Sequence, residues 1–265
     1  MTEPGYSIRP LATQAELETC AALQREIWGI SPSDSMSTIT MHALTMSYPT
    51  TGLLLGGFFG EEMVGLVVVL AALEPRTAYG HMLGVRDSHR DSGLGGRLSQ
   101  EAIRRFRERG GRFYCFTFDP LESRNSHLYL NRHGAAGIRF EPDAYGTSGA
   151  FHGGLPMDRL LARIDLDAPP PPPPPSLDEA LRLYPVATPE RMPDAEAVLA
   201  EIPADIGALR ETDHDAALAA SRSLRVLLDR YVTRGGLASC ALVRGEQGGA
   251  PRSFHLLRRV AEPEP

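Results

Sequence analysis

The sequence predicts an α/β protein with a mixed sheet covered by helices, followed by a smaller C-terminal α+β module. Three observations lead to this prediction. Amphipathic helical patterns and apolar strand patterns alternate over the first 168 residues. A run of seven prolines, Pro169–Pro175, then interrupts the chain, and helical and strand patterns resume after it. Within the first part, a glycine-rich turn joins an apolar run that ends at Val85 to an amphipathic stretch that begins near Leu98.

The first domain, residues 1–168, is predicted to start with helices and to continue with strands. Leu17, Cys20 and Leu23 recur at helical spacing, which predicts a helix over 16–28. A tight turn at Gly60 predicts an antiparallel hairpin. The further elements, in order, are a helix over 38–48, strands over 52–59, 62–73 and 79–85, a helix over 93–109, a strand over 112–118, a helix over 125–133, and strands over 138–145 and 156–166.

The proline run favours an extended polyproline II rod, so residues 169–176 are predicted to be a stiff linker. The C-terminal module, residues 177–265, is predicted to hold a strand over 198–203, a helix over 213–234, and a hairpin over 237–260 with its turn at 245–251. Such a module has a thin core of its own. We therefore expect it to pack on the first domain or on a second subunit of a homodimer.

Composition narrows the classes of function. Hydrophobic residues make up 42% of the chain and charged residues 23%, as in ordinary soluble proteins. A net charge of −6 argues against a nucleic-acid-binding protein. Neither a membrane-spanning run nor a secretion signal is visible, so we expect a cytoplasmic protein that does not bind membranes. Cys20, Cys115 and Cys240 lack metal-ligand spacing, and we expect buried thiols and no metal.

The turn before Leu98 has the composition of a phosphate-binding site. A strand, a glycine-rich turn and a helix together place backbone N–H groups around an anion at the helix N-terminus. Glycines let the ligand approach the backbone, and arginines and the helix dipole add positive potential. The residues predicted to bind phosphate are Arg90, Asp91, Ser92, Gly93, Leu94, Gly95, Gly96 and Arg97.

Two common phosphate-binding motifs are excluded. The P-loop needs a lysine, and all 27 basic residues of this chain are arginine. The dinucleotide fingerprint needs a glycine where the chain has Leu98. The pattern Arg-x-x-Gly-x-Gly, at Arg90, Gly93 and Gly95, instead resembles the pyrophosphate loop of the GNAT superfamily of acyl-CoA N-acyltransferases. The order of the predicted elements over residues 6–168 resembles that superfamily as well.

Longer stretches resemble a branch of GNAT-like proteins with a C-terminal extension. They are Leu23–Gly29, His81–Val85, Thr117–Leu121, Ser123–Asn125 and, beyond the linker, Glu201–Asp205. The resemblance implies acetyl-CoA or another acyl-CoA as cosubstrate. It implies further that the backbone of Leu83, Gly84 and Val85 pairs with the pantetheine arm and polarises the thioester carbonyl, and that Asn125 binds the pantetheine or a phosphate. For Gly84 the alternative is a packing glycine beneath a helix.

Two residues are candidates for catalysis. Alternation places residues 79, 81, 83 and 85 on one face of a strand, and some GNAT enzymes carry their base on that face. His81 is therefore a candidate base, with a hydrogen-bonded core histidine as the alternative. Many GNAT members place a tyrosine acid four residues before the glycine that ends the helix after the loop. That position is Leu130 here, and Tyr129 lies one residue away, about 100° around an α-helix. Either the helix is locally shifted, so that Tyr129 is the acid, or another donor serves, or the thiolate leaves without one.

These features predict transfer of an acyl group from acyl-CoA to a primary amine of a small molecule, with an amino-acid-like acceptor favoured. The attack is direct, in a ternary complex. A loop over 146–154 and Arg159 are expected near the acceptor. Two alternatives remain: a non-catalytic acyl-CoA sensor or interaction module, and an enzyme that acetylates proteins.

Overall fold

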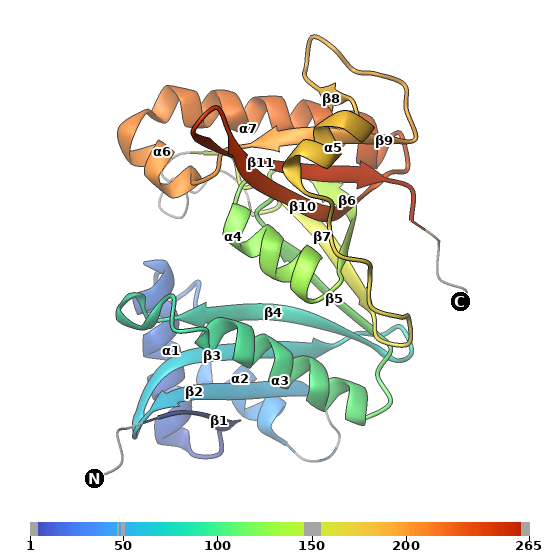
Figure 1. Ribbon diagram of the computed structural model, residues 1–265. Coiled ribbons are helices and arrows are strands. Elements are labelled where there is room, and N and C mark those ends of the chain that lie inside the picture. The colour runs from blue at the N-terminus through green and yellow to red at the C-terminus, as the bar shows by residue number, and fades with distance from the viewer. Residues whose placement is uncertain (1–4, 47, 49–50, 146–154, 261–265) are drawn as a thin grey trace. The chain divides into compact units, whose positions relative to one another are not determined.

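The structure is a computed structural model that describes residues 5–46, 48, 51–145 and 155–260 (Figure 1). The chain divides into two compact units, 1–116 and 117–265, and each is described by itself. The boundary falls inside strand β5 (Phe113–Phe118).

The first unit is a mixed sheet with helices on both faces (Figure 1). Its strands lie in the order β1-β2-β3-β4-β5, antiparallel except for the parallel pair β4–β5. The bounds are β1 Tyr6–Pro10, α1 Gln14–Trp28, α2 Thr38–Thr45, β2 Gly52–Phe59, β3 Glu62–Ala71, β4 Thr77–Val85, the 3-10 turn η1 Asp87–His89, and α3 Leu94–Glu108.

Helix α1 begins at a capping box. The Thr13 hydroxyl accepts a hydrogen bond from the Glu16 N–H, and the Glu16 carboxylate accepts bonds from the N–H groups of Ala12 and Thr13. These bonds lower the pKa of Glu16 to about 2. The helix ends at Gly29, whose φ of +62° is the left-handed conformation of a helix C-cap.

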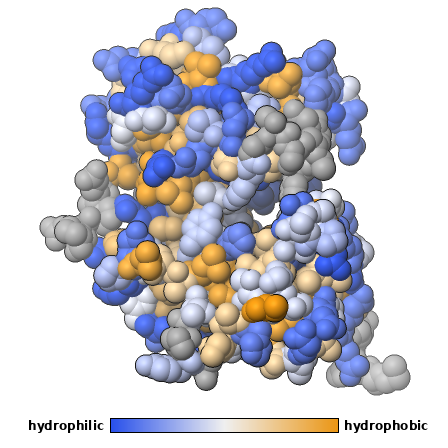
Figure 2. All heavy atoms as spheres, turned by 180° about the vertical axis from the view of Figure 1, so that it is seen from behind, coloured by the Kyte–Doolittle hydropathy of each residue, from blue (hydrophilic) through white to orange (hydrophobic). Residues whose placement is uncertain are grey.

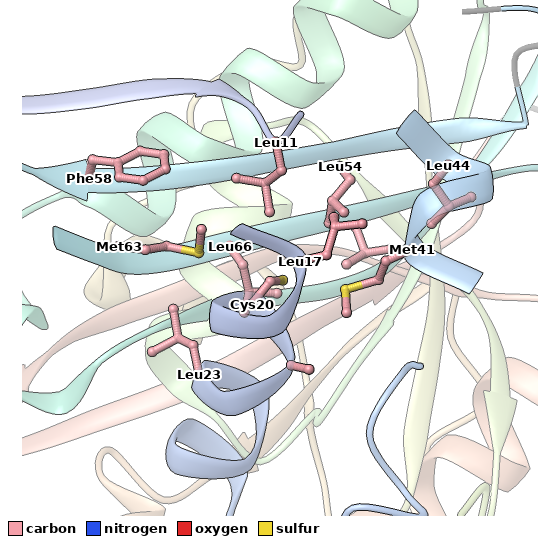
Figure 3. Packing of buried hydrophobic residues seen from close by; sticks show 12 residues of the cluster. Leu11, Leu17, Cys20, Leu23, Met41, Leu44, Leu54, Phe58, Met63 and Leu66 are labelled. Atoms are coloured by element: carbon pink, nitrogen blue, oxygen red, sulfur yellow. The ribbon is translucent and has the colours of Figure 1, made fainter. Parts of the chain in front are cut away.

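The main core of this unit lies between the sheet and helices α1 and α2. Figure 3 shows leucines of both helices, Cys20 of α1 and Met41 of α2 pointing at side chains of β2 and β3. Leu17, Cys20 and Met41 are at most 1% exposed. Helix α3 covers the opposite face, where Gly57 and Gly65 leave room for Leu94 and Leu98. The two helical layers therefore hold β3 and β4 from both sides.

The second unit holds strands in the order β7-β6-β10-β11-β9-β8. Helices lie against them, and β8 pairs with β9 in parallel. The bounds are α4 Ser123–Ser126, the π-helix η2 His127–Arg132, β6 Ala136–Glu141, β7 Arg159–Asp165, α5 Leu177–Leu183, β8 Val186–Ala187, β9 Ala197–Ile202, α6 Ile206–Thr212, α7 His214–Leu228, the π-helix η3 Asp229–Thr233, β10 Ala238–Gln247 and β11 Ala250–Arg258.

The predicted mixed α/β fold is confirmed, and most helices and strands lie within a few residues of their predicted bounds. The two strands of the C-terminal hairpin are longer than predicted, because the turn between them is formed by Gly248 and Gly249 alone, both with positive φ. Strand β1 and the short helices α5 and α6 were not predicted. The predicted linker, 169–176, lies inside the second unit, where β6 pairs with β10. The domain boundary at residue 168 stays a prediction.

The surface of the first unit is mixed in character. On the face that carries α1 and α2, hydrophobic and hydrophilic residues are interspersed (Figure 2). Exposed apolar side chains there include Ile39, at 83% exposure. Within the described ranges, none of the helices has the length and apolar character needed to cross a bilayer.

Candidate functional site

One edge of strand β4 is paired over only part of its length. The parallel ladder with β5 runs from Thr77–Phe113 to Gly80–Phe116 and stops there. On its other edge, β4 stays paired with β3 as far as Val85. In the described part of the chain, residues 81–85 therefore have strand partners on the β3 side alone. A strand edge with free N–H and C=O groups can accept an extended ligand as an additional strand.

A β-bulge lies where this open edge begins. Val69 faces Gly80 and Val68 faces Met82, so His81 is an extra residue in β4. The bulge breaks the predicted alternation, and the expectation that residues 79, 81, 83 and 85 share one face is wrong. Register with β3 puts Leu83 and Val85 on one face and Tyr79 on the other. His81 itself is exposed, and desolvation lowers the pKa of its imidazole below the ordinary value.

Gly84 is required by packing. Its missing Cβ would lie 2.8 Å from Cζ2 of Trp28 and 3.1 Å from Cδ1 of Ile27, both on α1. The alternative of a packing glycine beneath a helix is thus the one that the structure supports for its side-chain position. Its backbone still lies on the open edge of β4, so the proposed pairing with a ligand stays a prediction.

The predicted phosphate-binding turn follows β4 directly and forms an open helix N-terminus. Gly93 has φ +78° and is the N-cap of α3, with no atom within 4 Å of where its Cβ would lie. The first helical hydrogen bond runs from the Arg97 N–H to the Gly93 carbonyl, at 3.1 Å. In the described part of the chain, the N–H groups of Gly95 and Gly96 have no acceptor. Open N–H groups at this end of a helix suit an anion.

The two arginines of the turn differ in the interactions that they already make. Arg90 is 56% exposed and, among the residues that the structure describes, its ion-pair partner is the exposed carboxylate of Asp87, at 2.7 Å. Surface pairs of this kind are weak, so the Arg90 guanidinium can exchange Asp87 for a phosphate. Arg97 donates from its guanidinium to the Tyr6 carbonyl at 3.1 Å, which ties the first turn of α3 to β1.

The start of the turn is fixed from three sides. Arg86 follows β4 and makes ion pairs with Glu26 of α1 and with Glu62 of β3. Its Nε lies 2.6 Å from the Glu26 carboxylate. Nδ1 of His89 lies 2.9 Å from the Tyr6 hydroxyl, and the two rings meet edge to face. Arg86 is therefore occupied in holding the turn, which leaves Arg90 as the arginine exposed to a ligand.

The other predicted site residues lie in the second unit. Asn125 is exposed and belongs to the short helix α4. Tyr129 lies in η2, which is a π-helix and not the predicted α-helix. The His133 N–H donates to Leu128, five residues back, and the Ala135 N–H donates to Tyr129, six residues back.

The π-helix removes the discrepancy in register. A π-helical turn holds one residue more than an α-helical turn. Residues before it are therefore displaced by one residue around the helix relative to Gly134, which ends the helix with φ +68°. Tyr129 thus takes the angular position that a residue four before the glycine has in an α-helix. Leu130, the residue at that spacing, is 1% exposed and belongs to the core. Burial raises the pKa of the Tyr129 phenol to about 12.

A cluster of charged residues in this unit was not predicted. Oδ2 of Asp119 lies 3.3 Å from Arg210 and 3.9 Å from Arg159, and Arg210 also lies 3.5 Å from Glu122. Arg159, expected near the acceptor, is only 13% exposed. Burial and the nearby Asp119 raise the pKa of Glu122. The cluster joins segments 91 residues apart in sequence, so no local pattern could have indicated it. The loop over 146–154, also expected near the acceptor, lies outside the described residues.

Comparison with known proteins identifies the family. Residues 17–135 match the model of the acetyltransferase (GNAT) family. This part of the chain belongs to the GNAT family. The match ends at Ala135, directly after the π-helix, and includes the turn, the bulged strand and Tyr129. No curated protein matches the sequence.

Solved structures share the GNAT fold over about three fifths of the chain. The ribosomal-protein-S18-alanine N-acetyltransferase of Escherichia coli is 15% identical with a TM-score of 0.51, and the alignment covers 62% of this chain and 96% of that one. A GNAT acetyltransferase of Streptococcus pneumoniae is 19% identical with a TM-score of 0.50, covering 61% of this chain and all of the other. At these identities the similarity concerns the fold.

The packing of Gly84 against Trp28 gives a prediction for stability. Gly84→Ala should lower the free energy of unfolding by about 1–3 kcal/mol, since the added methyl group overlaps the indole. Adding Trp28→Phe should recover part of the loss by removing the overlapping ring atoms. Urea unfolding followed by circular dichroism measures both.

Gly95→Ala is the matched control for that experiment. Its Cβ would lie 3.6 Å from Val85, an ordinary contact, and alanine is favoured over glycine in a helix. This variant should be at least as stable as the parent. Equal stability of the Gly84→Ala variant and the parent would contradict the packing explanation.

Proposed function

We propose that this protein transfers an acyl group from acetyl-CoA or another acyl-CoA to a primary amine, by direct attack of the amine on the thioester in a ternary complex. The observation that carries the proposal is the continuity of the site in the first unit. The open edge of β4 over residues 81–85 leads directly into the turn with the free N–H groups of Gly95 and Gly96. An extended arm with a pyrophosphate at one end fits such an arrangement.

Each part of the cosubstrate has a residue suited to it. The N–H groups of Gly95 and Gly96, with Arg90, bind the pyrophosphate. The backbone of Leu83, Gly84 and Val85 pairs with the amides of the pantetheine arm as an added strand would. A backbone N–H on this edge then donates to the thioester carbonyl, where negative charge develops during the attack. From the second unit, Asn125 contributes a hydrogen bond to the arm or to a phosphate.

His81 is the proposed base. An amine attacks a thioester only after it has lost the proton of its ammonium form, and a neutral imidazole can accept that proton. Since desolvation lowers the pKa of His81, the ring is neutral at pH 7 and ready to accept. The nitrogen lone pair of the neutral amine then forms the C–N bond, and the C–S bond breaks with its electron pair on sulfur. The proton that the amide nitrogen loses passes through solvent to the thiolate, which leaves as free CoA.

Tyr129 is the proposed donor to the departing thiolate. Its pKa of about 12 keeps the phenol protonated throughout the neutral range. A thiol has a pKa of about 8.5, so complete proton transfer from this phenol to sulfur is uphill. The useful contribution of Tyr129 is therefore a hydrogen bond to sulfur while its charge develops.

The acceptor that we favour is a small molecule with an amino-acid-like structure. Its carboxylate would pair with an arginine such as Arg159, whose guanidinium presents two parallel donors. A protein N-terminus is the other class of amine, and the named enzyme from Escherichia coli acts on a ribosomal protein. We expect the reaction to take place in the cytoplasm.

Calorimetry and a thiol assay test this function directly. The protein is titrated with CoA and several acyl-CoAs, and release of free CoA is then followed over a panel of amines. Binding together with amine-dependent thiol release supports the proposal. Absence of CoA binding would refute it, and tight binding without thiol release would favour the sensor.

Gly93→Asp should abolish CoA binding, because it adds a carboxylate beside the free N–H groups that would hold the pyrophosphate. Gly110→Asp is the matched control. Gly110 lies at the other end of α3 with φ +80° and equally open surroundings, so it takes the same backbone strain. The control should bind CoA with the affinity of the parent. Unchanged affinity in a folded Gly93→Asp variant would show that another loop holds the cosubstrate.

The pH dependence of the reaction reports on His81. Because the folded-state pKa is lowered, kcat/KM should fall on the acid side with a midpoint below the ordinary histidine value of about 6.5. His81→Gln should lower kcat/KM by about 100-fold and remove this acid limb. Near-normal turnover of the variant across pH 6–9 would rule His81 out as the base.

Tyr129→Phe should lower kcat by about 100-fold while CoA binding stays unchanged, since the hydroxyl acts on the departing sulfur. Tyr231→Phe serves as the control, because Tyr231 also lies in a π-helix and its hydroxyl donates to the Pro193 carbonyl at 2.9 Å. This control should retain its kcat. Equal losses of kcat in both variants would place the effect of Tyr129 in folding.

A further inference from the structure

The two π-helices of the second unit have the same design. Tyr129 of η2 is followed five residues later by Gly134, with φ +68°, and the Ala135 N–H returns to the Tyr129 carbonyl at 3.0 Å. In η3, Tyr231 is followed five residues later by Gly236, with φ +66°, and the Leu237 N–H returns to the Tyr231 carbonyl at 2.9 Å. The two motifs are related by a constant offset of 102 residues.

The hairpins that follow repeat each other at the same offset. Strands β6 and β10 begin at Ala136 and Ala238. In the first hairpin, a bulge between Gly137 and Arg139 leaves Ile138 as the extra residue opposite β7. In the second, the register shifts between Ser239 and Ala241, which leaves Cys240 as the extra residue opposite β11. Equal spacing of tyrosine, glycine, strand start and bulge is hard to obtain by coincidence.

The two repeats meet at equivalent residues. Gly137 and Ser239, again 102 apart, are direct partners where β6 and β10 pair antiparallel. The strand order β7-β6-β10-β11 is symmetric about its centre when β6 is taken as equivalent to β10 and β7 as equivalent to β11. Such an arrangement is that of a local two-fold axis through the pair, as in a symmetric dimer. The first repeat runs from β5 to β7, and the second from β9 to β11.

The second repeat lacks the elements for binding a cosubstrate. In the first unit, 27 residues (86–112) separate β4 from β5 and hold the turn and α3. Only nine residues (188–196) separate β8 from β9, which is too short for a turn and a helix. The Tyr231 hydroxyl is already bonded to the Pro193 carbonyl. No phosphate-binding turn is therefore available in the second repeat.

The second repeat and its neighbour α6 instead bond to the loop that leads into α4. The buried ring of His255 donates from Nε2 to the Pro120 carbonyl at 2.7 Å and accepts from the Ser239 hydroxyl at Nδ1, also at 2.7 Å. The buried hydroxyls of Ser253 and Ser123 lie 3.1 Å apart. Arg210 pairs with Asp119 and Glu122 of the same loop.

A further pair of bonds attaches η2 itself. The amide of Asn131 donates to the Leu242 carbonyl and accepts from the Leu242 N–H, both at 2.8 Å. The side chain thus mimics a strand partner for β10. The loop before Tyr129 and the side chain of Asn131, two residues after it, are thus both bonded to the second repeat.

We infer that the C-terminal part of the chain is a second copy of the strand, helix and hairpin that carry Tyr129, and that it acts as a built-in partner. It occupies the β6 edge as a second subunit would, and it positions the segment 119–133 without binding a cosubstrate of its own. The catalytic consequence rests on the function proposed above, whereas the positioning does not.

Hydrogen exchange of the full chain, measured by mass spectrometry, tests the positioning. Arg210→Gln and, separately, Ser253→Ala should each speed exchange of peptides that cover 119–133 by about tenfold, the scale of a lost charged or buried hydrogen bond. The matched control is Arg252→Gln. It removes an arginine–carboxylate interaction of the bidentate kind, with Glu201 of β9, that involves no residue of 119–133. This control should leave exchange of 119–133 unchanged.

Unchanged exchange in both test variants, or an equal increase in the control, would overturn the inference. Calorimetry adds a readout of the missing second site: one CoA per chain is expected, and two would overturn the inference. In active protein, Arg210→Gln should lower kcat with little change in the dissociation constant for CoA. A chain that binds no CoA would refute the proposed function, while the exchange experiment would still decide the positioning.

Discussion

The pairing of β4 on one edge alone is the constraint on which the rest of the site depends. Up to Gly80 the strand is part of a continuous ladder, and from His81 onward it is bonded only to β3. An unpaired edge inside a protein normally invites unwanted association. Here the bulge at His81, the turn after Val85 and the packing of Trp28 on Gly84 define a short open segment whose length is that of a few backbone amides.

The turn that we propose for phosphate binding depends on the same strand. Arg86 comes directly after β4 and is fixed by carboxylates of α1 and β3, so the position where the turn begins is set by three elements. Gly93 then supplies the left-handed conformation with which α3 starts. The Leu94 N–H donates to the Ser92 hydroxyl, and within the described residues the next two N–H groups, of Gly95 and Gly96, have no acceptor. The turn is therefore preorganised: the entropy cost of ordering it is met when the protein folds, so ligand binding does not have to offset that cost.

Local chemistry made part of this arrangement predictable. Glycines with an arginine between a strand and a helix have few alternatives, and α3 begins where the pattern placed it. The face of β4 was predicted wrongly, because a bulge depends on the partner strand and leaves the alternation of the sequence unchanged. Gly84 could be explained only once Trp28, 56 residues earlier, was seen beside it. The charged cluster around Asp119 and Arg210 is a tertiary contact of the same kind.

The repeat could not be recognised from the sequence, for a related reason. Over the segments that start at Tyr129 and Tyr231, the tyrosine, one arginine, the glycine and one alanine recur, which is too little to stand out. What the copies share is backbone geometry: a π-helix, a left-handed glycine and a bulge at the third residue of the strand. Geometry of this kind is set by how a helix must pack on the hairpin that follows it, and many sequences satisfy it.

The π-helix occurs twice, and this helps to explain the position of Tyr129, for which we propose a catalytic role. A π-helix often marks a functional site, yet the second copy has the same turn without a cosubstrate site. The turn is therefore explained by packing, because it brings the tyrosine ring inward ahead of the glycine in both copies. In the second copy the hydroxyl is bonded to Pro193 and serves stability. In the first, the same geometry holds a phenol whose pKa burial has raised to about 12. The catalytic use that we propose for Tyr129 would thus build on a position that the fold already provides.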